Sequence, residues 1–158
     1  MIDFALPADA VAPQLLGCTL THAGVSIRLT EVEAYLGAED SAAHTFKGKT
    51  SRNAAMFGPP GRFYVYISYG IHRNVNIVCA PEGTGQGCLL RGGEIIEGAD
   101  TAFARRGTSD FHNLARGPGN LGKALGFTLE DNHQPIQIVE RTTEPEWVCG
   151  PRIGISKN

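Results

Sequence analysis

Two glutamates, Glu31 and Glu33, are the residues of this sequence whose type and spacing most directly suggest chemistry. They lie in the segment 25–35, where apolar and polar residues alternate with the period of a β-strand. We expect one face of that strand to carry Val25, Ile27, Leu29, Glu31, Glu33 and Tyr35. On such a face the two glutamate Cα atoms would lie about 6.5–7 Å apart. A carboxylate at the end of an apolar face is costly unless it has a partner or a task. The pattern therefore suggests a general base beside an aromatic residue, and the alternative is a strand that runs out into solvent.

The four tyrosines of the chain fall in two short segments. Tyr35 ends the strand just described, and Tyr64, Tyr66 and Tyr69 lie in the β-branched, aromatic segment 63–69. In a strand, Tyr64 and Tyr66 share a face, whereas Tyr69 lies on the other face. Aromatic faces presented together can stack on a flat base, although ordinary sheet packing explains them as well.

Further polar residues stand close to these segments. His44 follows the paired glutamates and could reach the same pocket. Arg91 ends an apolar strand, CLLR, and an arginine in that position favours a carboxylate partner. Asn74 and Asn76 alternate within a predicted strand, where asparagine is disfavoured, so we expect one of them to have a hydrogen-bonding task.

The elements that must position these residues are mainly short strands. We expect strands at 63–69, 74–80, 87–91, 135–140 and 147–155, and helices at about 38–44, 93–106 and 119–125. Short links between strands predict an antiparallel sheet, and strands followed by helices favour the α+β class. No internal repeat or Pro/Ser-rich linker divides the 158 residues, so we expect a single domain over residues 1–158.

The net charge of −2 is unusual for a protein that binds nucleic acid. Basic residues nevertheless gather between Ser41 and Pro81, a stretch without Asp or Glu: Lys47, Lys49, Arg52, Arg62 and Arg73. A second basic group is Arg105, Arg106, Arg116 and Lys123. A local basic face on a neutral protein can hold phosphates, and a solvated loop with chance charge is an equal alternative.

Several classes of protein are not predicted. No apolar run approaches the length of a membrane span, and residues 1–13 lack the features of a secretory signal, so we expect a cytoplasmic, nucleoid-associated protein. The four cysteines form no C-x-x-C pair, and no histidine stands at ligand spacing from them, so no metal site is predicted. A nucleophile elbow and a P-loop are also missing from the sequence.

Taken in order, five segments resemble one family: EVEAYLGAEDSAAH (31–44), SRNAAMFGPPGRFYVYISYGIHRNVNIV (51–78), LLRGGE (89–94), RGPGNLGKALG (116–126) and PRIGI (151–155). The chain is similar to the alkyladenine (3-methyladenine) DNA glycosylase family over about residues 15–155. That resemblance implies a mixed α+β domain with a curved antiparallel β-sheet and surrounding short helices. Members usually continue beyond the PRIGI segment into a stretch rich in aromatic residues and arginine, whereas this sequence ends at Asn158.

The resemblance also implies catalytic roles. Glu33, directly before Ala34 and Tyr35, corresponds to the general base that activates water, and Glu31 to a supporting residue. Arg91 corresponds to the partner that helps to hold this water, and the backbone carbonyl of Ile153 to the third contact of the water.

Other positions correspond to residues that bind DNA. Tyr35, His44 and Tyr66 match the pocket that sandwiches the flipped base. Asn76 matches the residue that crowds the 2-amino group of guanine, and Tyr69 the side chain that wedges into the gap left in the duplex.

The activity that the resemblance implies is that of a monofunctional DNA glycosylase in base excision repair. Such an enzyme flips alkylated or deaminated purines, 3-methyladenine-like bases and hypoxanthine, out of double-stranded DNA and hydrolyses the glycosidic bond. Because no lysine falls at the matched pocket positions, we expect no strand cleavage, and the scheme needs no metal or organic cofactor. We expect a monomer. The alternatives are a non-catalytic damaged-DNA-binding module of the same fold and, more weakly, an RNA substrate.

Overall fold

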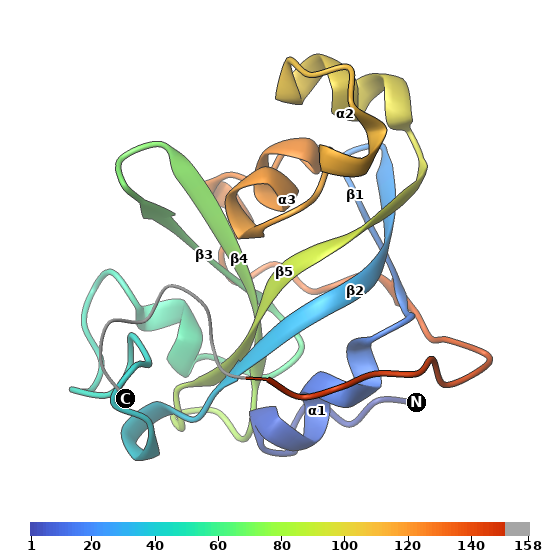
Figure 1. The fold of residues 1–158 in the computed structure, drawn as a ribbon. Helices are drawn as coiled ribbons and strands as arrows, with labels where there is room; N and C mark the ends of the chain where they lie inside the picture. Colours follow the sequence, from blue (N-terminus) through green and yellow to red (C-terminus); the bar gives the residue numbers. More distant parts are fainter. Residues whose placement is uncertain (151–158) are drawn as a thin grey trace.

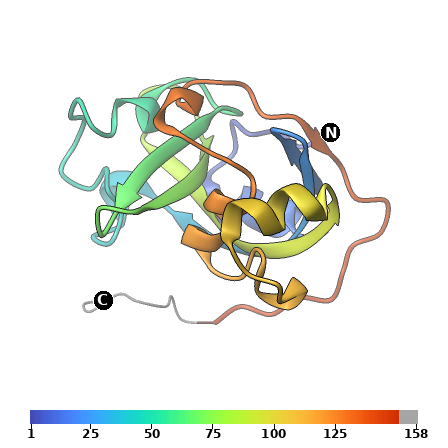
Figure 2. The ribbon, with the colours of Figure 1, turned by 90° about the horizontal axis from the view of Figure 1, so that it is seen from above.

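The fold is built on one antiparallel sheet that places the long strands β2 and β5 side by side. The computed structural model describes residues 1–150 of the chain. In this part, six strands pair in the order β3–β4–β5–β2–β1–β6, and Figures 1 and 2 show how strongly the sheet curves. The strands are β1 (Thr19–His22), β2 (Val25–Tyr35), β3 (Phe63–Ser68), β4 (His72–Cys79), β5 (Gln86–Glu97) and β6 (Ile138–Val139). The predicted α+β class with a curved antiparallel sheet is confirmed.

Three α-helices of the described chain contribute to the main core on one face of the sheet. They are α1 (Ala8–Leu15), α2 (Ala99–Arg106) and α3 (Pro118–Ala124). Their apolar side chains, among them Leu15, Ala102 and Leu121, belong to the same buried cluster as Ile27, Ile77 and other strand residues. No helix within residues 1–150 is long and apolar enough to cross a membrane. Burial of apolar area in this core is the main force that holds the sheet in its curve.

The opposite face of the sheet carries a smaller cluster and the candidate site. Ala55 and Met56 of the 3₁₀ helix η2 (Ala54–Phe57) pack there against Tyr64 and Val78. A second 3₁₀ helix, η1 (Gly37–Glu39), follows β2. The loop between η1 and η2 lies at the same end of the molecule as both 3₁₀ helices (Figure 1).

Strand β2 changes the face that it presents to the main core part-way along its length. Leu29 pairs with Gly93 and Glu31 pairs with Gly92, so Thr30 is an extra residue, a β-bulge. Before the bulge the main core receives Val25, Ile27 and Leu29; after it, the core receives Val32 and Ala34. The expected face from Val25 to Tyr35 is therefore wrong beyond Leu29, because the bulge shifts the alternation by one residue. The same shift turns Glu31, Glu33 and Tyr35 away from the main core.

Other expected elements differ in extent. The predicted helix at 93–106 begins only at Ala99, because residues up to Glu97 pair with β2 and Gly98, with φ of 80°, separates strand from helix. The predicted helix at 38–44 is reduced to η1, since the Asp40 carboxylate accepts hydrogen bonds from the backbone N–H groups of Leu36 and Ala42. In the predicted strand at 147–155, residues 147–150 are not extended into a strand, and the remainder lies outside the described residues.

Helix α3 approaches β4 so closely that Gly122 has no room for a side chain. A Cβ at Gly122 would overlap the carbonyl oxygen of Arg73, a backbone atom of β4. We predict that Gly122→Ala lowers the free energy of unfolding by about 2–3 kcal/mol, the upper range for overpacking. Urea unfolding measures this loss. Lys123→Ala, at an exposed position of the same helix, should change stability by less than about 0.5 kcal/mol. Equal stability of the two variants would contradict the close contact.

Candidate active site

A half-buried ion pair between Glu33 and Arg91 joins strands β2 and β5 at the centre of the site. Glu33 Oε1 lies 3.0 Å from Arg91 Nη1, and the two side chains are 9% and 15% exposed. The hydroxyl of Tyr35 donates a 2.7 Å hydrogen bond to Glu33 Oε2. Removing a carboxylate from water is costly, and a guanidinium partner with a hydroxyl donor offsets that cost.

The structure separates the two glutamates that the sequence pattern left equivalent. Glu31 is 51% exposed, and its Oε2 lies 3.7 Å from Arg91 Nε, a longer and wetter contact. Two consecutive register shifts produce this difference: Thr30 is extra on β2, and Arg91 is extra on β5. The guanidinium of the extra residue Arg91 lies near both carboxylates, but only the Glu33 carboxylate is buried.

The Glu33–Arg91 pair retains hydrogen-bonding capacity. Among the described residues, Glu33 Oε1 and Arg91 Nε have no aligned hydrogen-bond partner, although the two side chains lie within ion-pair distance. A close ion pair with poor alignment leaves a buried acceptor beside a buried donor. A water molecule or a substrate group that entered this place could donate to the carboxylate and accept from the guanidinium.

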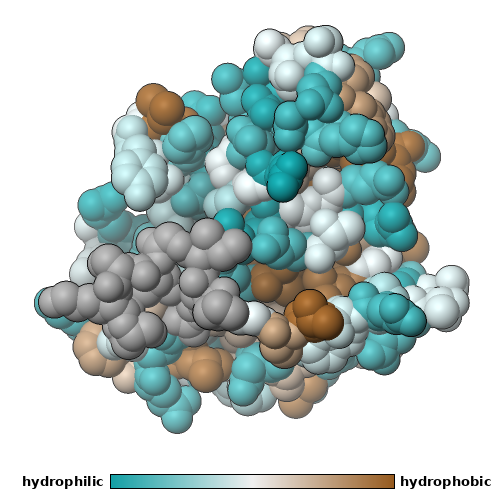
Figure 3. Space-filling view, in the orientation of Figure 1, coloured by the Kyte–Doolittle hydropathy of each residue, from teal (hydrophilic) through white to brown (hydrophobic). Residues whose placement is uncertain are grey.

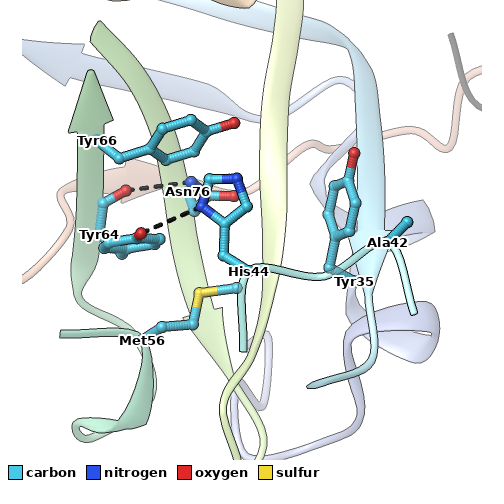
Figure 4. A pocket seen from close by; sticks show the side chains of 7 residues that line it. All are labelled: Tyr35, Ala42, His44, Met56, Tyr64, Tyr66 and Asn76. Carbon is cyan, nitrogen blue, oxygen red and sulfur yellow. Dashed lines mark hydrogen bonds between the residues drawn. The ribbon is translucent and has the colours of Figure 1, made fainter. Parts of the chain in front are cut away.

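An aromatic pocket lies on the same face of the sheet. It has about 290 Å³ of empty space, part of it open to solvent, and its lining consists of Tyr35, Ala42, His44, Met56, Tyr64, Tyr66 and Asn76. Figure 4 shows Tyr35 on β2 across the pocket from Tyr64 and Tyr66 on β3. The His44 and Tyr66 ring centres are 4.1 Å apart, and those of Tyr64 and Tyr66 are 5.6 Å apart. The rings of this lining offer faces on which a flat aromatic molecule can stack.

The strand register links this pocket to the carboxylate. Tyr64 pairs with Asn76, Asn76 with Leu89, and Leu89 with Glu33, so these residues form one row across β3, β4, β5 and β2. Asn76 is 3% exposed, and its Nδ2 donates to the Tyr64 carbonyl at 3.3 Å. Asn74 Nδ2 donates to Ser68 Oγ at 3.1 Å. The expected hydrogen-bonding task of an asparagine is thus confirmed for both.

The titratable groups of the pocket favour their neutral forms. Burial raises the pKa of Tyr64 to about 12, with the neighbouring Tyr66 adding to the effect. Burial also raises the pKa of Tyr66, and the negative charge of Glu33 contributes. His44 is still partly open to water, but its partial burial among aromatic rings lowers its pKa below 6.5, and the charge of Arg52 lowers it further. A pocket of neutral aromatic groups near neutral pH can accept a cationic ring without charge repulsion.

Hydrogen bonds of buried side chains hold His44 in place. Asn53, 4% exposed, donates from Nδ2 to the carbonyls of His44 and Gly48 at 3.0 and 3.1 Å. Its Oδ1 accepts from the backbone N–H of Thr50 at 2.7 Å. The buried hydroxyl of Thr45 donates to the Gly85 carbonyl, which ties this loop to the β4–β5 turn.

Tyr69 stands apart from the pocket, at the tip of the β3–β4 hairpin. It is 92% exposed and has φ of 51°, and Ile71 beside it is 74% exposed. Figure 3 shows apolar surface at this tip, at the upper left of the view. The structure thus brings Glu33, Arg91, Tyr35, and the pocket residues together and leaves Tyr69 on a projection. Ile153, predicted to contribute a backbone carbonyl, lies outside the described residues.

Three pocket-lining residues were not among the positions matched to the family: Tyr64, Met56 and Ala42. The shared face of Tyr64 and Tyr66 was a usable signal for the first. Nothing in the local pattern marks Met56 or Ala42, because both reach the pocket through the path of the loop that follows β2.

The two basic groups have different surroundings. Lys47 and Arg52 line a wide groove that shares His44, Tyr64 and Tyr66 with the pocket. In contrast, Arg105 donates to the carbonyls of Ala23 and Ala124, and Arg106 to those of Asn113 and Leu114. Arg105 and Arg106 of the second basic group are therefore structural, whereas Arg116 and Lys123 of that group are exposed, as are Lys47 and Arg52 in the groove beside the pocket.

Comparison with known proteins identifies the family of the chain. The family described as methylpurine-DNA glycosylase matches residues 2–158. The chain belongs to this family. It is 68% identical to a protein of Corynebacterium efficiens over 99% of this chain and 85% of that protein, and 64% identical to one of Corynebacterium glutamicum over 99% and 86%. A protein of Cutibacterium acnes is 50% identical over 100% of this chain and 90% of its own length. All three are provisionally named 3-methyladenine DNA glycosylases.

Membership in the methylpurine-DNA glycosylase family confirms the resemblance found in the sequence. The protein is a DNA glycosylase, a hydrolase of DNA repair, and its substrate is DNA. In this family setting, the carboxylate–guanidinium pair and the aromatic pocket are the candidate active site.

We predict that Arg52→Ala raises the pKa of His44, because it removes a positive charge that disfavours the imidazolium. Burial remains, so the value should stay below 6.5. Titration of the histidine ring resonances by NMR measures this change, with Lys49→Ala in the same loop as the control. Because His44 is favoured in its neutral form, it should also make the fold less stable as the pH falls below 6.5. An unchanged titration midpoint in Arg52→Ala would contradict this electrostatic account.

Proposed function

We propose that this chain, acting as one domain over residues 1–158 and as a monomer, excises damaged purines from double-stranded DNA by hydrolysis. The substrates are 3-methyladenine-like bases and hypoxanthine, and the place of action is the nucleoid. The observation that carries the proposal is the ion pair of Glu33 with Arg91, which Tyr35 connects directly to the aromatic pocket. One side chain, Tyr35, thus both lines the pocket and holds the carboxylate.

Glu33 is assigned the role of general base. A base inside a duplex is inaccessible, so the enzyme must first extrude it, at a cost of a few kcal/mol that is lower for damaged pairs. A water molecule held between Glu33 and Arg91 then attacks C1′ of the sugar. Its proton passes to the Glu33 carboxylate, the C1′–N9 bond breaks, and the bonding electrons leave with the base. The carboxylate also stabilises the positive charge that develops on the sugar.

The pocket is assigned the role of recognising the extruded base. Alkylation at N3 or N7 makes a purine cationic, and the electron-rich faces of Tyr35 and Tyr66 attract such a ring. His44, neutral near pH 7 because of its lowered pKa, completes the sandwich without repelling it. The buried Asn76 in the pocket wall crowds the 2-amino group of a normal guanine. Hypoxanthine lacks that group, but it is neutral and a poorer leaving group, so it must gain a proton from solvent as the C1′–N9 bond breaks.

The surface around the pocket is assigned to the DNA strands. Tyr69, exposed at the hairpin tip, is suited to fill the gap left by the extruded base. Lys47 and Arg52 in the adjoining groove can neutralise phosphates of the damaged strand. The carbonyl of Ile153 is proposed as a further contact of the attacking water.

The test is single-turnover base release from duplexes that carry 3-methyladenine or hypoxanthine, analysed with and without alkali. The native protein should release the base and leave a strand that breaks only after alkali. Glu33→Gln should lower the rate by about 10²–10⁴-fold, the usual contribution of a general base, and should still bind the lesion. Glu31→Gln is the matched control. Its rate of base release should fall much less, since Glu31 is half-exposed.

Three results would contradict the proposal. If Glu33→Gln released the purine as fast as the native protein, Glu33 would not be the general base. Strand breakage without alkali would indicate an amine-dependent mechanism. Lesion binding by the native protein without base release would identify a non-catalytic binding module.

A further inference from the structure

We propose that Met56 sets the depth of the base pocket, and thereby the largest purine that the enzyme excises; this inference rests on the proposed function. Met56 lies on η2, is 2% exposed, and lines the pocket. In Figure 4 its thioether lies at the lower end of the pocket, beneath the rings of Tyr64 and His44. It offers the base no strong hydrogen-bonding group, so its effect on recognition must come from the volume that it occupies.

The end of the Met56 side chain rests on the backbone of strand β5 at Gly87. A Cβ at Gly87 would lie 2.7 Å from Met56 Cε and 2.8 Å from Sδ. Gly87 pairs directly with Tyr35 across the sheet, so this Cβ would point to the pocket face. Because Gly87 has no side chain, the thioether of Met56 can lie directly against the backbone of β5. This contact sets the present depth of the pocket.

The backbone that carries Met56 is fixed more firmly than its side chain. Phe57, the next residue, lies over Gly85, where a Cβ would come within 2.7 Å of the Phe57 ring. The carbonyl of Phe57 also accepts a 2.7 Å hydrogen bond from the N–H of Gly83. Methionine is unbranched and has three rotatable side-chain bonds. A side chain added at position 87 should thus displace the thioether toward the pocket and leave η2 in place.

Two substitutions should then change the pocket in opposite directions. Met56→Ala deepens it, and Gly87→Ala pushes the thioether into it. A pocket distinguishes ligands that differ by one methylene by about 1–3 kcal/mol, or roughly 10–200-fold. The sensitive measure is the ratio of the single-turnover rates for a large and a small lesion. Ethenoadenine, a purine with an additional fused five-membered ring, serves as the large lesion, and hypoxanthine as the small one.

We expect Met56→Ala to raise this ratio by about tenfold or more and Gly87→Ala to lower it by a similar factor. Met56→Leu, which conserves volume, is the matched variant and should keep the native ratio. Urea unfolding of each variant separates a loss of fold from a change of selectivity. Because Gly87→Ala also brings the new Cβ to 3.1 Å from the Ile77 carbonyl, it is the variant at risk of misfolding. If Gly87→Ala does not fold, the ratios of Met56→Ala and Met56→Leu alone test the inference.

An unchanged ratio in Met56→Ala, or an equal loss of rate on both lesions, would overturn the inference. Failure of the proposed function is distinguishable from this result, because the native protein would then release neither base.

Discussion

Burying a carboxylate is costly, and the contact between Glu33 and Arg91 offsets that cost at the point where β2 and β5 run side by side. The pair lies between the main core, which receives Val32 and Ala34 from the same strand, and the aromatic pocket, which receives Tyr35. Removing either charge would leave the other largely out of water. The requirement for a satisfied pair therefore constrains both strands, and through the hydroxyl of Tyr35 it also constrains one wall of the pocket.

Two β-bulges make this arrangement possible. A regular strand would place Glu33 on the same face as Val25, Ile27 and Leu29, in contact with the main core. Thr30 shifts β2 by one residue, and Arg91 shifts β5 in return, so that pairing resumes at Val32 and Leu90. Bulges near active sites commonly redirect a side chain in this way. Here one strand serves the core with its first half and the candidate site with its second half.

The sequence was informative where the chemistry is local. Alternation predicted β2, the aromatic run predicted β3, and the family motifs identified Glu33, Arg91 and the pocket aromatics as a group. The bulge at Thr30 was not predictable, because neither Thr30 nor its neighbours differ in type from residues of a regular strand. Helix α2 was predicted too long, because Ile95 and Ile96 fit helical spacing with Ala99, whereas pairing with β2 holds the segment 93–97 in β5. Met56 and Asn53 were also missed, since their positions depend on how the loop after β2 folds back.

The central claim, that Glu33 and Arg91 work as one unit in holding and activating the water, is tested most directly by a double-mutant cycle in single-turnover excision of 3-methyladenine from duplex DNA. The cycle compares the native protein with Glu33→Gln, Arg91→Met and the double variant. If the pair works as one unit, the double variant should be no slower than Glu33→Gln alone, because Arg91 has little to contribute once the carboxylate is gone. Independent, multiplicative losses in the double variant would contradict this account and would assign Arg91 a role separate from Glu33.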